Sequence, residues 1–223
     1  MLIIILIVLI ILYKFILHSK KYNIESKIIS LDKLNYIKGE DLFNPHIFNH
    51  KFSDINLSTI IQKIPNNYYF LNDKLIRIND FILNDKYIYK NQKLSHDLDL
   101  NTTGYDIFNY FKTNISFNTN HSLSLIKGNY NTNIKKNKNN ITLLNILNGQ
   151  CTVYIINPKH DKDIQSLNFN KIKKWSITLS LHSHQILYIP TNWFYIIEVN
   201  KECIILHTES DTYFTSIYNI IRD

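Results

Sequence analysis

The chain has 223 residues, of which 45% are hydrophobic and 19% charged, and its formal net charge is +7. This length fits one domain plus an appendage, and the apolar content is too high for a disordered chain. The lysines are spread along the chain and are not interleaved with aromatic residues, so we expect no nucleic-acid partner. Two cysteines, Cys151 and Cys203, exclude a disulfide scaffold and a cysteine zinc site, and we expect both as small core residues in a reducing compartment.

Residues 1–18 are predicted to form a transmembrane signal anchor. The segment Met1–Leu17 reads MLIIILIVLIILYKFIL and has Lys14 as its only charged residue. Its length lies at the short end of what can cross the hydrocarbon core as a helix, and Lys14 stands where its side chain can reach the interface. No small-residue cleavage site follows, which disfavours a secretory signal peptide.

The charges around this segment predict its orientation. Basic residues follow it, at Lys20 and Lys21, and none precedes it, so the rest of the chain is expected in the cytosol. We therefore predict a single-pass membrane protein with a linker at residues 19–25 and one domain at residues 26–223. Heavy use of Ile, Asn, Lys and Tyr, whose codons are AT-rich, points to an AT-rich source such as a large DNA virus, and the membrane would then be viral or host.

The first half of the domain carries short helical patterns. Leu57–Ile64 follows Asn56, which is a suitable N-cap, and Ile78–Leu83 and Tyr105–Phe111 are similar. The polar stretch at residues 129–140 (NYNTNIKKNKNN) predicts a loop.

The second half predicts strands. Ile141–Leu147 and Cys151–Ile156 are separated by Asn148-Gly149-Gln150, and an Asn-Gly pair between apolar runs indicates a β-hairpin. Further strands are expected at Trp175–Leu181, Gln185–Ile189, Trp193–Val199 and Glu202–His207. Short strands with tight connections favour a mostly β fold with flanking helices, either an antiparallel barrel or a sandwich.

Three segments carry a resemblance to one family. Ser183–Val199 (SHQILYIPTNWFYIIEV) resembles the second half of cupin-like JmjC hydroxylases, with a strand ending Ile-Pro and then an aromatic pair. Leu143–Pro158 (LLNILNGQCTVYIINP) is similar to the family's hairpin, in which one strand reaches a Gly and the next ends before a Pro, and Leu75–Tyr89 is similar to its helix-then-strand entry. The match spans roughly residues 26–210, and it implies a double-stranded β-helix, that is, a cupin or jelly-roll barrel.

Active members of this family hold Fe(II) with a His-x-Asp pair and a distant His, which leaves positions open for 2-oxoglutarate and oxygen. The resemblance places the distant His on Tyr195 and the pair near Lys136 and Lys138, and residues 134–138 contain no His, Asp or Glu. The lysine that grips 2-oxoglutarate falls on Cys151, and a family Asn falls on His207. We therefore expect a degenerate triad, with no catalytic, cofactor-binding or metal-binding residue and no cofactor.

Other histidines could replace the lost ligands. His182 and His184 have a spacing used by metal ligands and would share a strand face, with His207 on a neighbouring strand. The resemblance, however, places His184 at a turn glycine at the barrel end, and ordinary surface histidines are the expected outcome. His121 and His160 are expected in polar loops. No base is predicted beside Cys151, so a new nucleophile there is not expected.

These observations predict a membrane-anchored pseudoenzyme, a catalytically degenerate cupin/JmjC-like domain with a binding or structural role and an unknown protein partner. One alternative is an Fe(II)/2-oxoglutarate-dependent hydroxylase with displaced ligands. Another is a small-molecule-binding cupin that uses the emptied barrel, for which an open, polar-lined pocket around Tyr195 is expected.

Overall fold

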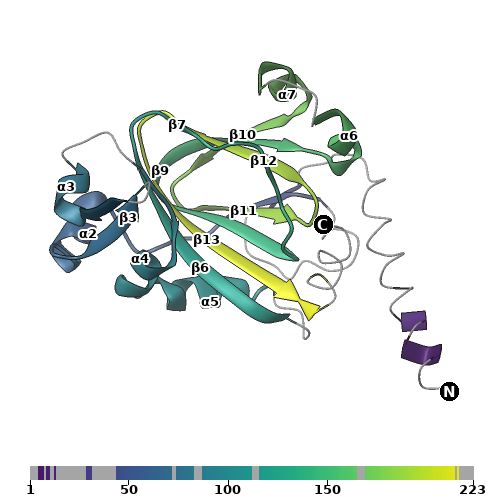
Figure 1. The fold of residues 1–223 in the computed structure, drawn as a ribbon, viewed down its shortest axis with the longest axis horizontal. Coiled ribbons are helices and arrows are strands. Elements are labelled where there is room, and N and C mark those ends of the chain that lie inside the picture. Colours follow the sequence, from purple (N-terminus) through teal and green to yellow (C-terminus); the bar gives the residue numbers. More distant parts are fainter. Residues whose placement is uncertain are drawn as a thin grey trace.

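The computed structural model describes residues 5–7, 9–10, 13, 29–31, 44–71, 74–82, 87–111, 116–164, 169–213 and 215. Within these residues the chain is mostly β, with strands wrapped around a common interior and short helices outside it (Figure 1). The strands are β1 (Ile29–Leu31), β2 (His46–Asn49), β3 (Tyr68–Leu71), β4 (Lys74–Arg77), β5 (Tyr87–Asn91), β6 (Ser116–Lys127), β7 (Tyr130–Asn131), β8 (Lys135–Lys136), β9 (Ile141–Ile156), β10 (Ile177–His182), β11 (Gln185–Pro190), β12 (Phe194–Val199) and β13 (Glu202–Thr212).

Two sheets share the long strand β9. One sheet has the order β1-β2-β11-β9-β13-β6-β5, and in the other β10 and β12 flank β9 while β7 and β8 pair with β12. Apart from the parallel pair β1–β2, these pairings are antiparallel. A double sheet that closes in this order is a jelly roll, the architecture of cupins. The prediction of a mostly β, cupin-like fold is confirmed.

The predicted hairpin at Asn148-Gly149-Gln150 is wrong. The first half of β9 pairs with β11 and β13, and its second half pairs with β10 and β12, so one strand turns a corner from one sheet into the other. Gly149 has a φ of +82°, and a Cβ there would lie 2.1 Å from the backbone oxygen of Glu202. The Asn-Gly signal therefore marks a close backbone approach at a barrel corner.

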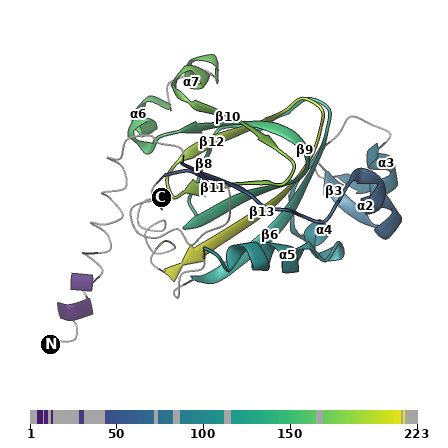
Figure 2. The ribbon, with the colours of Figure 1, turned by 180° about the vertical axis from the view of Figure 1, so that it is seen from behind.

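Two helices of the first half, α4 (Gln92–Asp97) and α5 (Leu100–Phe108), lie against the outer face of the larger sheet (Figure 2). Two more, α2 (Leu57–Lys63) and α3 (Ile78–Ile82), lie beside them near β3 and share the same apolar core. Helix α2 is confirmed with its cap, because the Asn56 side chain accepts a hydrogen bond from the backbone N–H of Thr59 at 2.9 Å. Helix α3 is also confirmed, whereas α5 begins and ends earlier than predicted. The predicted loop at 129–140 contains β7 and β8.

Alternate residues of the larger sheet pack on opposite sides. On β13, Ile204 and Leu206 belong to the cluster beneath the helices, whereas Cys203 and Ile205 face the barrel interior with residues of the smaller sheet. Full burial of one such side chain contributes about 1.5–3 kcal/mol, so both faces stabilise the sheet. Cys151 and Cys203 are free and buried in the interior, as predicted.

The outer face of the smaller sheet is covered by α6 (Asp161–Ile164) and α7 (Phe169–Trp175). Ile164 and Ile172 of these helices pack on Phe194 and Ile196 of β12. Odd-numbered residues of β12, such as Tyr195 and Ile197, consequently point into the barrel.

Most of the predicted anchor at residues 1–18, and the whole linker at 19–25, lie outside the described residues. Those described at the N-terminus include the helical residues Ile5, Leu6, Ile7, Leu9 and Ile10, whose exposed fractions are 45–57%. In the part of the chain that the structure describes, no helix is long and apolar enough to cross a membrane. The transmembrane helix stays a prediction.

Candidate functional site

A group of polar side chains occupies the barrel interior where β5, β8, β12 and β13 come together. We call it the interior cluster. Its members are Tyr89, Lys90, Lys135, Tyr195, His207 and Glu209.

An ion pair between Lys90 and Glu209 is the centre of this cluster. Lys90 has a φ of +50° where the register between β5 and β6 shifts, and its backbone N–H donates to the Ser124 hydroxyl at 2.9 Å. Its Nζ donates to a Glu209 carboxylate oxygen and lies 3.5 Å from the Tyr195 hydroxyl oxygen. Burial disfavours the ammonium, but Tyr195 and Glu209 outweigh it and raise the pKa of Lys90.

Lys135 is the second amine of the cluster, and it lies opposite Tyr195 in the β8–β12 pairing. Its Nζ lies 3.9 Å from the centroid of the Tyr89 ring. Burial, and then the charge of Lys90, lower the pKa of Lys135 to about 8, against the opposite effect of Glu209. The Tyr89 face favours the ammonium by about 1–2 kcal/mol and therefore opposes the lowering of the Lys135 pKa by burial.

His207 is fully buried behind these amines. Its Nε2 lies 2.8 Å from the hydroxyl oxygen of Ser124, and its ring lies edge-on to Tyr89. Burial, then the charges of Lys90 and Lys135, hold the pKa of His207 well below its usual value. The imidazole is therefore neutral at pH 7. Among the described residues the cluster offers a divalent cation one imidazole and one carboxylate, and Lys90 already neutralises the carboxylate.

The structure places the predicted degenerate positions on different faces. Tyr195 lies inside the barrel, but Lys136 faces outward, where its Nζ donates to Asp161 at 2.7 Å. Lys138 is exposed. Instead, Lys135 lies opposite Tyr195, and Asn137, two residues further on, lies beside Trp193.

The side chain of Asn137 makes hydrogen bonds that hold the surrounding backbone in place. Its amide donates to the backbone oxygens of Ile189 and Pro190 at 2.8 and 3.0 Å, and its carbonyl accepts from Thr142 at 2.7 Å. At the predicted cosubstrate position, Cys151 is 3% exposed among apolar side chains. Across the described ranges, no three or more His, Cys, Asp or Glu side chains are grouped so as to hold a metal ion.

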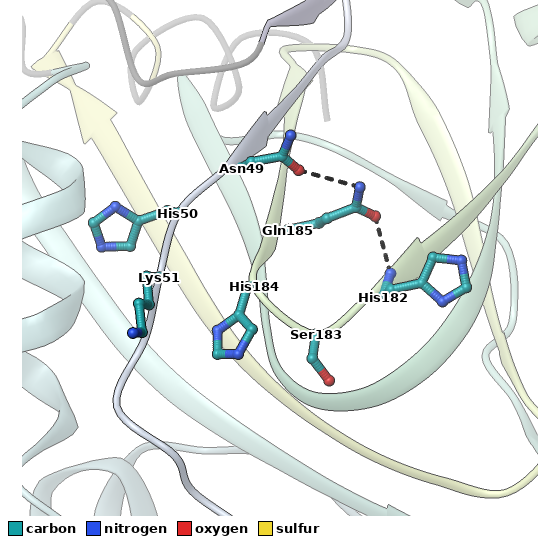
Figure 3. A pocket seen from close by; sticks show the side chains of 7 residues that line it. All are labelled: Asn49, His50, Lys51, His182, Ser183, His184 and Gln185. Atoms are coloured by element: carbon teal, nitrogen blue, oxygen red, sulfur yellow. Dashed lines mark hydrogen bonds between the residues drawn. The ribbon is translucent and has the colours of Figure 1, made fainter.

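His182 and His184 lie at one end of the barrel, beside a hollow of about 470 Å³ that His50, Lys51 and Gln185 also line (Figure 3). His182 ends β10 and His184 lies in the following turn, so the turn position expected for His184 is confirmed and the shared strand face is wrong. His207 is fully buried in the interior cluster, so the expectation of a surface histidine is wrong for this residue.

His184 holds a neighbouring segment in place. It has a φ of +70°, and its Nδ1 accepts a hydrogen bond from the backbone N–H of Phe52 at 3.1 Å. A neutral imidazole that accepts at Nδ1 carries its proton on Nε2, so neither nitrogen of His184 offers a lone pair to a metal. The hydrogen bond explains why a histidine is present at this turn.

The prediction that His121 lies in a polar loop is wrong. His121 is part of β6 and is 5% exposed, and its Nδ1 lies 3.1 Å from the Thr208 hydroxyl oxygen. Burial lowers the pKa of His121 to about 4. His160 ends a short 3-10 turn, Pro158–His160, and its ring lies beside Trp175.

The sequence reasoning missed Lys90, Glu209 and Lys135. Glu209 keeps the alternation of Cys203, Ile205 and His207 along β13, so extending that strand by two residues would have found it. Lys90 has no comparable signal, because the register shift in β5 interrupts the alternation.

No family model matches the chain, and no curated protein matches it. Among solved structures, it is similar to a cupin superfamily protein from Desulfitobacterium hafniense, with a TM-score of 0.32 and 12% identity over 45% of this chain and 71% of that one. The cupin domain of Cnp3 from Schizosaccharomyces pombe gives a TM-score of 0.33 and 18% identity over 50% of this chain and 66% of that one. A conserved protein of unknown function from Streptococcus pyogenes gives a TM-score of 0.32 and 8% identity over 43% and 66%. Because these similarities are distant, the fold is assigned here from the strand order.

Proposed function

We propose that this protein is a membrane-anchored, cupin-like barrel with a binding or structural role, and that it does not perform iron-dependent hydroxylation. One observation carries the proposal: Lys135 lies opposite Tyr195 inside the barrel, and Asn137, two residues further on, lies beside Trp193. Iron of this class is bound by imidazole and carboxylate, and an ammonium beside the site repels it. Glu209, the carboxylate of the interior cluster, is paired with Lys90.

The membrane anchor is the second part of this proposal. Residues 1–18 are almost entirely apolar, and the side chains described there, such as Leu6 and Ile10, are about half exposed, at 57% and 45%. A segment this apolar needs a cover, and a bilayer supplies one. Lys14, Lys20 and Lys21 then keep the barrel on the cytosolic side of a viral or host membrane.

Iron binding tests the first part. The full chain is purified in detergent, loaded anaerobically with Fe(II), desalted, and assayed for iron and for conversion of 2-oxoglutarate to succinate. We expect background iron and no succinate, both for the wild type and for Glu209→Gln. One iron per chain with succinate formation, both lost in Glu209→Gln, would establish the rival hydroxylase.

Membrane extraction tests the second part. The full chain is expected to stay with membranes after carbonate washing. Leu6→Arg with Ile10→Arg is expected to release it, because each arginine costs about 2.5–3.5 kcal/mol at the centre of a spanning helix. The matched control, Asn23→Arg with Ser26→Arg in and beside the linker, is expected to stay bound. Equal extraction of all three proteins would rule out a spanning anchor.

A further inference from the structure

The two amines of the interior cluster have unequal surroundings. Lys90 is neutralised by Glu209 and is close to the Tyr195 hydroxyl. Within the described residues, the contact found for the Lys135 Nζ is the Tyr89 ring face, and it has no ion pair with a carboxylate. One lysine is therefore held as an ammonium by a carboxylate, whereas the contact found for the other is the weaker one of an aromatic face.

The placement of Lys135 suits a nucleophile. It is partly buried on β8, with the ammonium of Lys90 and the carboxylate of Glu209 facing it from β5 and β13. A lysine that is desolvated and lies near a second cationic group is a recognised form of activated amine. A pKa of about 8 leaves roughly a fifth of Lys135 unprotonated at pH 7.4, against about one part in a thousand for an ordinary lysine.

The Tyr89 ring that Lys135 contacts belongs to a group of three tyrosine rings. Tyr130 lies 4.0 Å from Tyr87 and 5.9 Å from Tyr89, between ring centroids, and all three rings are partly exposed at the edge of the interior cluster. An aromatic surface of this kind favours a small, weakly polar molecule over a large charged one.

We propose that Lys135 condenses with small aldehydes at this edge of the barrel. The lone pair of Nζ adds to the carbonyl carbon and gives a carbinolamine. The nitrogen then loses a proton, the hydroxyl group leaves as water, and a C=N bond forms, so one amine and one aldehyde give one imine and one water. The reaction depends on neither the membrane anchor nor the absence of iron.

Reductive trapping tests this reaction in the full chain in detergent. Limiting propionaldehyde and cyanoborohydride are added at pH 7.4, and the alkylated lysines are identified by peptide fragmentation in a mass spectrometer. Lys136 is the internal control, because it is the next residue, faces the opposite side and is paired with Asp161. We expect Lys135 to react about 100-fold faster than Lys136, and the rate of Lys135 to level off above pH 8.

Two variants make the assignment specific. Lys136→Arg is expected to leave the fast reaction intact, and Lys135→Arg to abolish it with an unchanged circular dichroism spectrum. Lys90→Met removes the neighbouring charge and is expected to slow Lys135 at least several-fold. If Lys135 in the wild-type chain reacts no faster than Lys136, the proposal is overturned whether or not any variant folds.

Discussion

Gly104 lies inside helix α5, directly against the ring of His121. A Cβ built at Gly104 would lie 2.2 Å from Nδ1, 2.6 Å from Cε1 and 2.9 Å from Cγ of that ring. His121 is buried and held by Thr208, so its ring has little room to move. Gly104→Ala therefore forces either the helix or the histidine to shift.

Two opposing effects decide the sign of this substitution. Alanine in place of glycine inside a helix stabilises it by about 0.5–1 kcal/mol. Overpacking a buried contact costs about 1–3 kcal/mol, and losing the hydrogen bond between His121 and Thr208 costs about 1 kcal/mol more. We expect a net loss of about 2 kcal/mol in the free energy of unfolding.

Urea unfolding of the full chain in detergent, followed by the fluorescence of the two tryptophans, of which Trp193 is buried, measures this loss. His121→Ala removes the obstacle, so Gly104→Ala is expected to stabilise that background by about 0.5–1 kcal/mol, as in an ordinary helix. A stabilising Gly104→Ala in the wild-type background would refute the packing argument.

Three further expectations concern the same scaffold. Gly149→Ala should destabilise the barrel by about 3 kcal/mol or more in urea unfolding, because the new Cβ would lie 2.1 Å from the Glu202 backbone oxygen and alanine is strained at a positive φ. A loss below about 1 kcal/mol would contradict a close backbone approach at Gly149. His184→Gly should be more stable than His184→Ala by about 1 kcal/mol, because both lose the bond to Phe52 but only alanine is strained at a φ of +70°; equal midpoints would argue against strain. Burial lowers the pKa of His121 in the folded protein to about 4 from 6.5, so the free energy of unfolding is unaffected by this group above pH 6.5 and falls by up to about 3 kcal/mol as the pH drops towards 4. The free energy of unfolding of His121→Gln should depend less on pH between 6.5 and 4, and an unchanged dependence would contradict the lowered pKa.

Strand positions were predictable because both faces of the larger sheet are buried. Apolar runs such as Ile186–Ile189 stand out whichever way their side chains point. The same property hides the direction of each side chain, since alternation is lost when both faces are apolar. His121 was misplaced for the related reason that polar residues of β6, such as Ser122 and Ser124, resemble a loop although they are buried.

The interior was less predictable than the strands. Pairing of β8 with β12 decides that Lys135 faces inward and Lys136 outward, and this register depends on two short strands within a polar stretch. A shift of one residue exchanges the two lysines between faces. The loss of imidazole and carboxylate from residues 134–138 could still be predicted, because it holds in either register.

The Lys90–Glu209 pair raises the question of whether the cluster stabilises the barrel. Each side chain is 22% exposed, so both charges are largely desolvated. Lys90→Met alone, or Glu209→Met alone, leaves one charge without its partner. We expect a cost of about 2 kcal/mol, below the roughly 3–5 kcal/mol of a fully buried pair, because each side chain is 22% exposed. The double variant removes both charges and is expected to be within about 1 kcal/mol of the wild type, because apolar replacements of a buried pair are often neutral or stabilising.

Urea unfolding of the four proteins gives the coupling energy between the two side chains. If the double variant loses as much free energy of unfolding as the two single variants together, the two side chains are not coupled, which would contradict an ion pair between them. If the double variant is as stable as the wild type, the charges contribute little to folding. Their place beside Lys135 would then be explained better by what they do to that amine than by what they do for the barrel.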